Sequence, residues 1–363
     1  MTWSDAYSES RLFKALKKAW DEKASDLHLR EDEPAVIRKH GDLVPISDLT
    51  PNREDIHKFI DPMLTVEQLR DFEERQELDS GADIEGVCRL RLNLFIQRHK
   101  LCVAIRLLPN RIPTMEELYL PRACTHFCEM HKGLVLVTGP TGSGKSTTLA
   151  AMLDYINGKR PVHMLTIEDP IEYVYKNKKA MVSQREIGDD SHTFASALRH
   201  AFRQDPDVVL LGEMRDLETM QMSITLAETG HLTFSTLHTG EAAQTVSRIV
   251  DSFPPHQQAM VRAQLGTSLA GVISQQLLPL KDGTGRVAAR EVLVVNRGVA
   301  NLIRENKLEQ IQTAMQTGSS DMMFTMNYSI GHLYKSGFIT YETAYYASFD
   351  KRDFQNKFGK GKA

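Results

Sequence analysis

Cysteine is scarce in this sequence, which has four cysteines among 363 residues. No two of them form a C-x-x-C pair, which argues against a disulfide scaffold and against a cysteine-based metal site. Cys124 and Cys128 are four residues apart, so in a helix they would share one face. We therefore expect the two to be buried rather than metal-bound.

Net charge and long apolar runs are also lacking. The 44 lysines and arginines nearly balance the 47 aspartates and glutamates, which gives no sign of a nucleic-acid-binding surface. The longest apolar stretches, such as residues 134–137 and 208–211, fall far short of the roughly 20 residues that span a bilayer. Residues 1–5 are polar and acidic and do not resemble a signal peptide. These features favour a cytoplasmic protein.

The patterns predict an α/β protein with a division near residue 110. Residues 1–108 combine helical and alternating patterns, typical of a small α+β domain with an antiparallel sheet. Residues 109–120 begin with a proline-containing stretch and are interpreted as a linker. Residues 121–295 repeat apolar strand, loop and helix, which favours a mostly parallel sheet covered on both faces. Residues 296–363 return to a helical pattern.

The strongest motif follows the apolar run 134–137, which is typical of a buried strand. It fits G-x-x-x-x-G-K-[ST], where glycines let backbone N–H groups surround phosphate oxygens. In this pattern the lysine reaches the β- and γ-phosphates and the next hydroxyl binds Mg²⁺. A helical pattern begins directly afterwards, so its positive end would face the phosphates. The sequence therefore predicts a nucleoside triphosphate site formed by Gly139, Pro140, Thr141, Gly142, Ser143, Gly144, Lys145, Ser146 and Thr147.

Acidic residues end two further strand patterns. Glu213 follows the apolar run 208–211, where it could polarise a water molecule or hold Mg²⁺ through one. Glu168 ends the short run 165–167 and is a second candidate for Mg²⁺ or for the attacking water. An acid in such a place is usually a solvated strand end. For Glu213, a role in catalysis or Mg²⁺ binding is favoured over a solvated strand end, because the predicted phosphate loop belongs to the same α/β unit.

Two histidines, His231 and His238, bracket the next strand pattern, so one of them lies near its carboxyl end. A neutral imidazole there can sense the γ-phosphate or orient an acid. Zinc binding is less favoured, because no third ligand has the spacing to join them.

The order of these four elements resembles the ATPases of type II secretion and type IV pilus systems, as their Walker A, Asp, Walker B and His boxes. Within that superfamily, residues 24–29 and 301–304 are similar to the type IV pilus retraction ATPases, the PilT/PilU group. The resemblance covers about residues 11–348. Extension ATPases are longer at the N-terminus and carry a tetracysteine element, and this chain shows neither, so retraction is favoured.

The resemblance implies a homo-hexamer in which an N-terminal PAS-like domain moves against a RecA-like ATPase domain as ATP is hydrolysed. It implies that this motion turns the inner-membrane platform protein of the pilus and drives pilin back into the bilayer. The protein would then be cytoplasmic and peripheral at the inner membrane, with ATP and Mg²⁺ as its cofactors.

Roles for single residues also come from the resemblance. Lys145 and Ser146 would hold the phosphates and Mg²⁺, Glu213 would be the catalytic base, and Glu168 would assist with metal or water. In the same way, His231 and His238 would couple the nucleotide to the subunit interface. Arg91 and Arg106 would neutralise charge on the phosphates.

One departure from the family pattern leaves alternatives open. The arginine of the family's Ala-Ile-Arg-Asn-Leu-Ile element is replaced by Ala300, in an element that matters for retraction. The chain could therefore be an ATP-binding adaptor ring for a paralogous pilus ATPase, or a type IV secretion or DNA-transfer ATPase. The apolar face of this element, formed by Val299, Leu302 and Ile303, could pack on the ATPase core or transmit motion to a partner.

Overall fold

The computed structural model describes residues 10–39, 42–84, 88–109 and 111–359. They separate into two compact units, of which the first comprises the chain up to Ile112 together with Pro170–Val174. The second comprises Pro113–Asp169 and the chain from Tyr175 onward. The helices after residue 296 therefore belong to the second unit.

The first unit is α+β, as predicted, and its six strands form an antiparallel sheet in the order β3-β2-β1-β6-β5-β4. Strand β4 was not predicted, because its residues are poor in apolar side chains. The elements are α1 (Arg11–Asp21), β1 (Asp26–Arg30), β2 (Val36–Lys39), β3 (Asp42–Pro45), α2 (Arg53–Ile60), a 3₁₀ turn (Asp61–Met63), α3 (Val66–Arg75), β4 (Glu77–Ile84), β5 (Cys88–Gln97) and β6 (Lys100–Pro109).

Buried and partly exposed residues alternate along β5, so one face of this sheet is buried. Leu90, Leu92 and Leu94 are buried and join α1 and α2 side chains in one apolar core. Successive side chains of a strand point to opposite faces, so Arg91 lies on the face away from that core. Arg106 on β6 is its direct register partner, which places the two arginines side by side.

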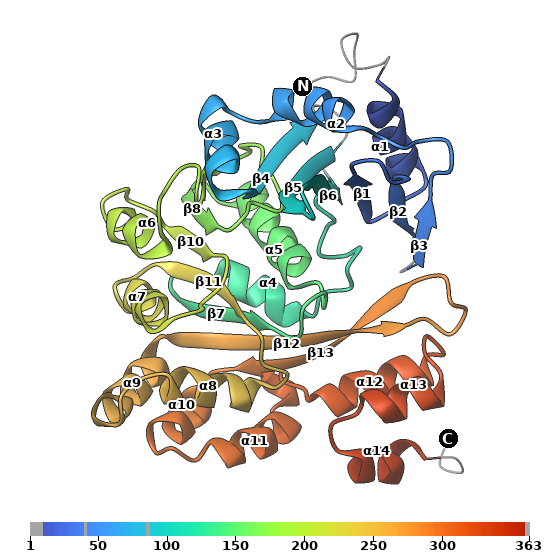
Figure 1. Cartoon of the computed structure of the whole chain (residues 1–363). Coiled ribbons are helices and arrows are strands. Elements are labelled where there is room, and N and C mark those ends of the chain that lie inside the picture. Colours follow the sequence, from blue (N-terminus) through green and yellow to red (C-terminus); the bar gives the residue numbers. More distant parts are fainter. Residues whose placement is uncertain (1–9, 40–41, 85–87, 110, 360–363) are drawn as a thin grey trace. The chain divides into compact units, whose positions relative to one another are not determined.

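The second unit contains a seven-stranded sheet in the order β13-β12-β7-β11-β10-β8-β9 (Figure 1). Every neighbouring pair is parallel except β12 with β13. The elements up to the last strand are α4 (Arg122–Glu129), β7 (Gly133–Thr138), α5 (Lys145–Lys159), β8 (His163–Glu168), β9 (Met181–Glu186), α6 (Phe194–Ala201), β10 (Val208–Leu211), α7 (Leu217–Glu228), β11 (Leu232–Leu237), α8 (Ala242–Asp251), α9 (Pro255–Ser268), β12 (Leu269–Pro279) and β13 (Arg286–Val294).

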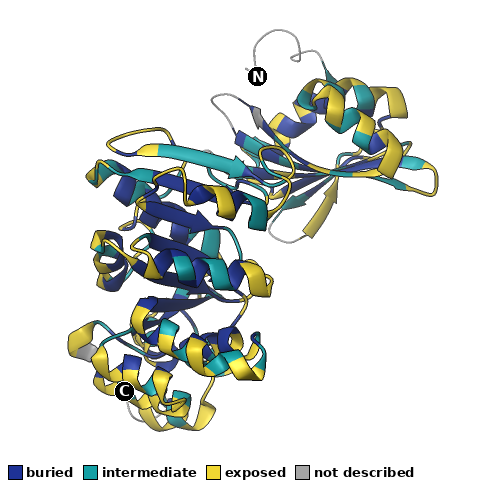
Figure 2. Cartoon of the chain, turned by 90° about the vertical axis from the view of Figure 1, so that its left-hand side faces the viewer, coloured by how far each residue is buried: buried dark blue, intermediate teal, exposed yellow. Residues whose placement is uncertain are grey.

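The central strands β7, β10 and β11 are buried along their whole length, as expected for parallel strands with helices on both faces. Figure 2 shows them in dark blue between helices whose outer surfaces are exposed. Because β7, β11, β10 and β8 are mutually parallel, the segments that follow them emerge at the same edge of the sheet. The fold thus gathers the predicted phosphate loop, His238, Glu213 and the end of β8 at one edge.

The C-terminal part consists of α10 (Arg297–Arg304), α11 (Ile311–Thr317), α12 (Met326–Lys335), α13 (Tyr341–Ala347) and α14 (Lys351–Phe358), with 3₁₀ turns at Leu308–Gln310 and Ser319–Asp321. Val299 and Ile303 of α10 are buried in the main core, and Leu302 is partly buried against it. The Arg304 guanidinium donates a hydrogen bond to Gly266 O on α9 at 2.9 Å. The apolar face of α10 thus packs on the core of the second unit, the first of the two interpretations of this element.

Cys124 and Cys128 lie on α4 and are buried, as the sequence predicted. Burial raises the pKa of the Cys124 thiol to about 12. Among the helices of the described ranges, none combines the length and the apolar character needed to cross a bilayer.

Candidate functional site

The predicted phosphate loop connects β7 directly to α5. Gly139, Gly142 and Gly144 adopt positive φ angles of 143°, 76° and 87°, which residues with a Cβ rarely adopt. At Gly139 a Cβ atom would also lie 2.1 Å from Gln275 O and 2.7 Å from Ser143 Oγ. The loop conformation therefore requires glycine at this position. Helix α5 has Gly144 as its N-cap, so no side chain caps its first turn.

Polar groups inside the loop suit a phosphate ligand. The Lys145 ammonium donates hydrogen bonds to Gly139 O at 2.8 Å and to Pro140 O at 3.2 Å. These bonds keep the positive charge of Lys145 beside the phosphate loop. The Ser143 hydroxyl is buried and has no hydrogen-bond partner among the described residues. A charged donor, a buried hydroxyl and a helix N-terminus form a set that fits phosphate oxygens.

Strand β12 stabilises the phosphate loop through side-chain hydrogen bonds, a contact that the sequence analysis did not predict. The buried Gln275 side chain donates to Ser143 O at 2.7 Å and accepts from Thr148 Oγ1 at 2.9 Å. Beside it, the Ser274 and Thr138 hydroxyls are hydrogen-bonded at 2.8 Å. The sequence contained a signal for this contact. Ser274 and Gln275 interrupt an otherwise apolar strand, and buried polar side chains need hydrogen-bond partners.

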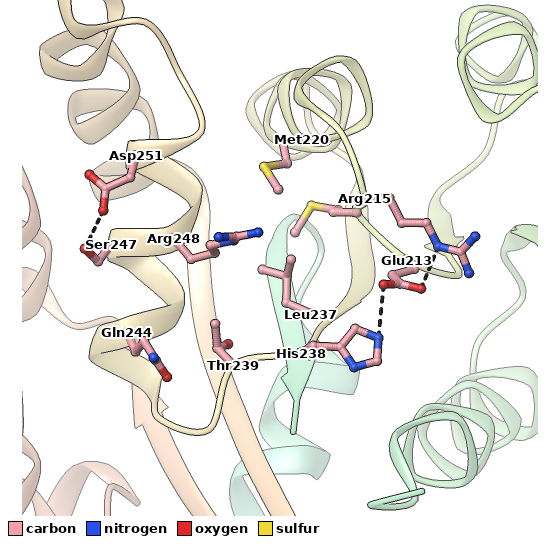
Figure 3. A pocket seen from close by; sticks show the side chains of 11 residues that line it. Glu213, Arg215, Met220, Leu237, His238, Thr239, Gln244, Ser247, Arg248 and Asp251 are labelled. Atoms are coloured by element: carbon pink, nitrogen blue, oxygen red, sulfur yellow. Dashed lines mark hydrogen bonds and ion pairs between the residues drawn. The ribbon is translucent and has the colours of Figure 1, made fainter. Parts of the chain in front are cut away.

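Glu213, which follows β10, is held from two sides (Figure 3). Its Oε1 atom lies 3.0 Å from His238 Nε2, and its Oε2 atom accepts a hydrogen bond from Arg215 Nε at 2.8 Å. Arg215 also lies 3.5 Å from Asp169. The hydrogen bond to Glu213 is the main reason why the pKa of Arg215 is raised. A cavity of about 520 Å³ adjoins Glu213 and His238 and extends along α8, so the carboxylate is open to solvent on one side.

Glu168 ends the neighbouring strand β8 and is buried. Gly212 N donates to Ile167 O at 2.9 Å, so the backbone just before Glu213 is bonded to the backbone just before Glu168. The Gln184 amide on β9 donates to Glu168 Oε1 at 3.4 Å, a contact that the sequence did not suggest. The structure thus brings the two acids to adjacent strand ends.

The two histidines lie at opposite ends of β11. His238 follows the strand and contacts Glu213, whereas His231 precedes it, about 20 Å away for a six-residue strand. The His231 Nδ1 atom lies 3.0 Å from Leu226 O at the end of α7, and its ring packs edge-on against Phe202. Within one chain, the structure therefore does not bring His231 to the sheet edge that carries the phosphate loop.

Arg91 and Arg106 belong to the first unit, on the exposed face of its sheet. Arg106 Nε donates to Asp26 Oδ1 at 2.9 Å. Burial would raise the pKa of Asp26, but hydrogen bonds from Ser25 and Arg106 outweigh burial and hold that pKa below its usual value. Contact of either arginine with a nucleotide stays a prediction.

Comparisons with known proteins agree with this arrangement. The family model described as "Type II/IV secretion system protein" matches residues 3–283. The chain is 48% identical over 321 residues to the type IV pilus retraction ATPase PilT of Pseudomonas aeruginosa, covering 88% of this chain and 93% of that protein. It is 36% identical over 331 residues to the type IV pilus ATPase PilU of the same organism, covering 91% of this chain and 87% of PilU.

A solved structure gives the same result. The crystal structure of the pilus retraction motor PilT with bound ADP superposes with a TM-score of 0.88 at 47% identity, covering 94% of this chain and 98% of that one. Sequence and fold therefore match over nearly the whole of both chains. The chain belongs to the type II/IV secretion system protein family and, within it, to the PilT/PilU group.

Proposed function

We propose that this chain is an ATP-hydrolysing motor that powers the retraction of type IV pili. The observation that carries the proposal is the position of Glu213, fixed by His238 and Arg215 at the sheet edge that also bears the phosphate loop. An oriented carboxylate beside a phosphate-binding loop is the arrangement that directs a water molecule to a γ-phosphate.

Each polar group then has a distinct task. Lys145 holds the β- and γ-phosphates of ATP, and Ser146 and Glu168 are the residues that would hold Mg²⁺, which supplies positive charge to the phosphates. Glu213 accepts the proton of the attacking water. The hydrogen bond that Arg215 donates to Glu213 and the close contact of His238 with the other oxygen fix the orientation of the carboxylate.

The chain would work as a homo-hexamer, with Arg91 and Arg106 completing a nucleotide site by compensating phosphate charge. The chain would act in the cytoplasm, peripheral at the inner membrane, where its partner would be the inner-membrane platform protein of the pilus. A paralogous pilus ATPase would be a second partner. The 48% identity to PilT, which is described as a retraction ATPase, supports a retraction motor over an adaptor ring.

Phosphate release by the purified full chain, measured over a range of protein concentrations, tests the enzymatic part. Activity per chain should rise with concentration as rings form, and a fully active monomer would end the hexamer proposal. The retraction part is tested by expressing the chain in a strain whose retraction ATPase gene is deleted. If the chain hydrolyses ATP but does not restore retraction of the pili in the strain from which it comes, the adaptor or secretion alternatives would be favoured.

A further inference from the structure

Strand β13 carries a buried carboxylate that the proposed chemistry does not use. Glu291 is 4% exposed, and no lysine or arginine forms an ion pair with it in the described part of the chain. Its two oxygens accept backbone hydrogen bonds instead: Oε1 from Ala242 N at 2.8 Å and Oε2 from Met326 N at 3.1 Å. Burial raises the pKa of Glu291, and these two hydrogen bonds only partly oppose that effect. A buried acid of this kind needs a reason to be there.

Both donors are the first residues of helices. Ala242 begins α8 and Met326 begins α12, so one carboxylate binds two positively polarised helix ends. The N-cap of α8, Glu241, makes no capping hydrogen bond with its own side chain. Glu291 therefore takes the place of a local cap for α8.

The start of α8 also determines the position of the loop that carries His238. Only Thr239, Gly240 and Glu241 separate His238 from the helix. Gly240 N donates to Gln244 Oε1 at 3.2 Å, and the Thr239 and Thr245 hydroxyls are hydrogen-bonded at 2.7 Å, so this short loop is folded back onto α8. A displacement of the first turn of α8 would displace His238 and its contact with Glu213.

The second carboxylate oxygen of Glu291, Oε2, connects the start of α8 to the C-terminal helices through its hydrogen bond from Met326 N. Val292 and Phe324 exchange backbone hydrogen bonds of 2.9 and 3.2 Å, so the chain entering α12 is fixed to β13. Both α8 and α12 contact β13, which passes above them in Figure 1. A second contact joins the two regions, because a Cβ atom on Gly240 would lie only 3.4 Å from the Phe349 ring.

We infer that Glu291 is a positioning residue for ATP hydrolysis, which fixes the His238 loop by anchoring α8 to β13 and α12 through its two carboxylate oxygens. It acts on Glu213 through α8 and His238 and does not touch the nucleotide. This inference rests on the proposed ATPase function, and it ties the C-terminal helices to the hydrolysis site of the same chain.

The first test is Glu291→Gln, which keeps the shape of the side chain. The amide has one oxygen, so it can accept from only one helix, and its NH₂ group faces the other N–H donor. We expect the kcat for ATP hydrolysis to fall by about tenfold or more, as for a catalytic group that is slightly misplaced. The affinity for a fluorescent ATP analogue should stay within roughly twofold, because the phosphate loop is untouched. The melting temperature should fall no more than in the Thr340→Ala control described below, because the removal of a buried charge partly offsets the lost hydrogen bond.

A second variant removes the bond from the opposite side. Ala242→Pro deletes the N–H donor at the first position of α8, where proline is well tolerated. The backbone of Glu241, with φ −130° and ψ 150°, suits a following proline. We expect Ala242→Pro to reproduce the kcat loss, and the double variant to be no worse than either single one, because both interrupt the same connection from α8 through Glu291 to α12.

The matched control is Thr340→Ala, which removes the N-cap hydrogen bond of α13 but leaves Glu291 alone. It should lower the melting temperature without changing kcat. Wild-type kcat in Glu291→Gln would overturn the inference, as would losses of melting temperature, affinity and activity in parallel. Absence of activity in the wild-type chain would instead count against the proposed function.

Discussion

The Nε2 atom of His238 lies 3.0 Å from Oε1 of Glu213, which joins the ends of the neighbouring strands β11 and β10. This contact uses one oxygen of the carboxylate, and Arg215 binds the other. The cavity beside Glu213 leaves this oriented carboxylate within reach of a water molecule whose proton it can accept.

Lys145→Ala should reduce ATP turnover to background. The substitution removes the fixed positive charge that the loop carbonyls of Gly139 and Pro140 hold in place. Steady-state phosphate release measures the effect, and an unchanged melting temperature would show that the fold is intact. Turnover near the wild-type level would mean that the phosphates bind elsewhere.

Glu213→Gln should keep nucleotide binding and lose hydrolysis, because an amide cannot accept a proton from water. Binding is measured with a fluorescent nucleotide and hydrolysis by phosphate release. The control is Glu168→Gln, at the adjacent strand end. If Glu213→Gln remains active while Glu168→Gln is inactive, the base is Glu168.

The two histidines should behave differently. His238→Ala should lower kcat by about 10- to 100-fold, because Glu213 loses the group that orients it. His231→Ala removes a contact at the end of α7, and we expect mainly lower thermal stability. Loss of hydrolysis in a normally stable His231→Ala protein would show instead that His231 acts on the nucleotide of a neighbouring subunit.

Gln275→Leu should destabilise the phosphate loop. Ser143 O and the Thr148 hydroxyl would lose their hydrogen bonds to this side chain, at a cost of about 1–3 kcal/mol in the free energy of unfolding. We expect the KM for ATP to rise as well. Gln276→Leu is the control, because its side chain donates to Ala347 O and not to the loop. Equal effects of the two substitutions on KM would contradict the role of Gln275.

The Asp26–Arg106 pair should make the first unit sensitive to acid. The pKa of Asp26 is held below its model-peptide value of 3.8, so its stabilising effect is present above that value and is lost as the pH falls through the folded-state pKa. Arg106→Gln should reduce that loss. Urea unfolding at about pH 6 and about pH 3 measures the difference. An identical pH dependence in both proteins would show that the pair contributes nothing.

The sequence by itself determined the phosphate loop, the alternation of strands and helices, and the order of the acidic and histidine elements. These features are local: glycines allow positive φ angles, and a buried parallel strand must be an apolar run. The apolar face of α10 was equally visible, but two surfaces could have covered it. Only packing showed that Val299 and Ile303 lie in the core.

Tertiary structure decided which polar groups meet. Gln275 supports a loop more than a hundred residues earlier in the chain, and Glu291 bonds the first residues of two helices on either side of it in sequence. His231 and His238 flank the same strand, and only the position of that strand in the sheet showed which one faces Glu213. The physical reason is the same in each case. A buried polar group must find a partner, but the partner is chosen by strand order and helix packing, which no local pattern encodes.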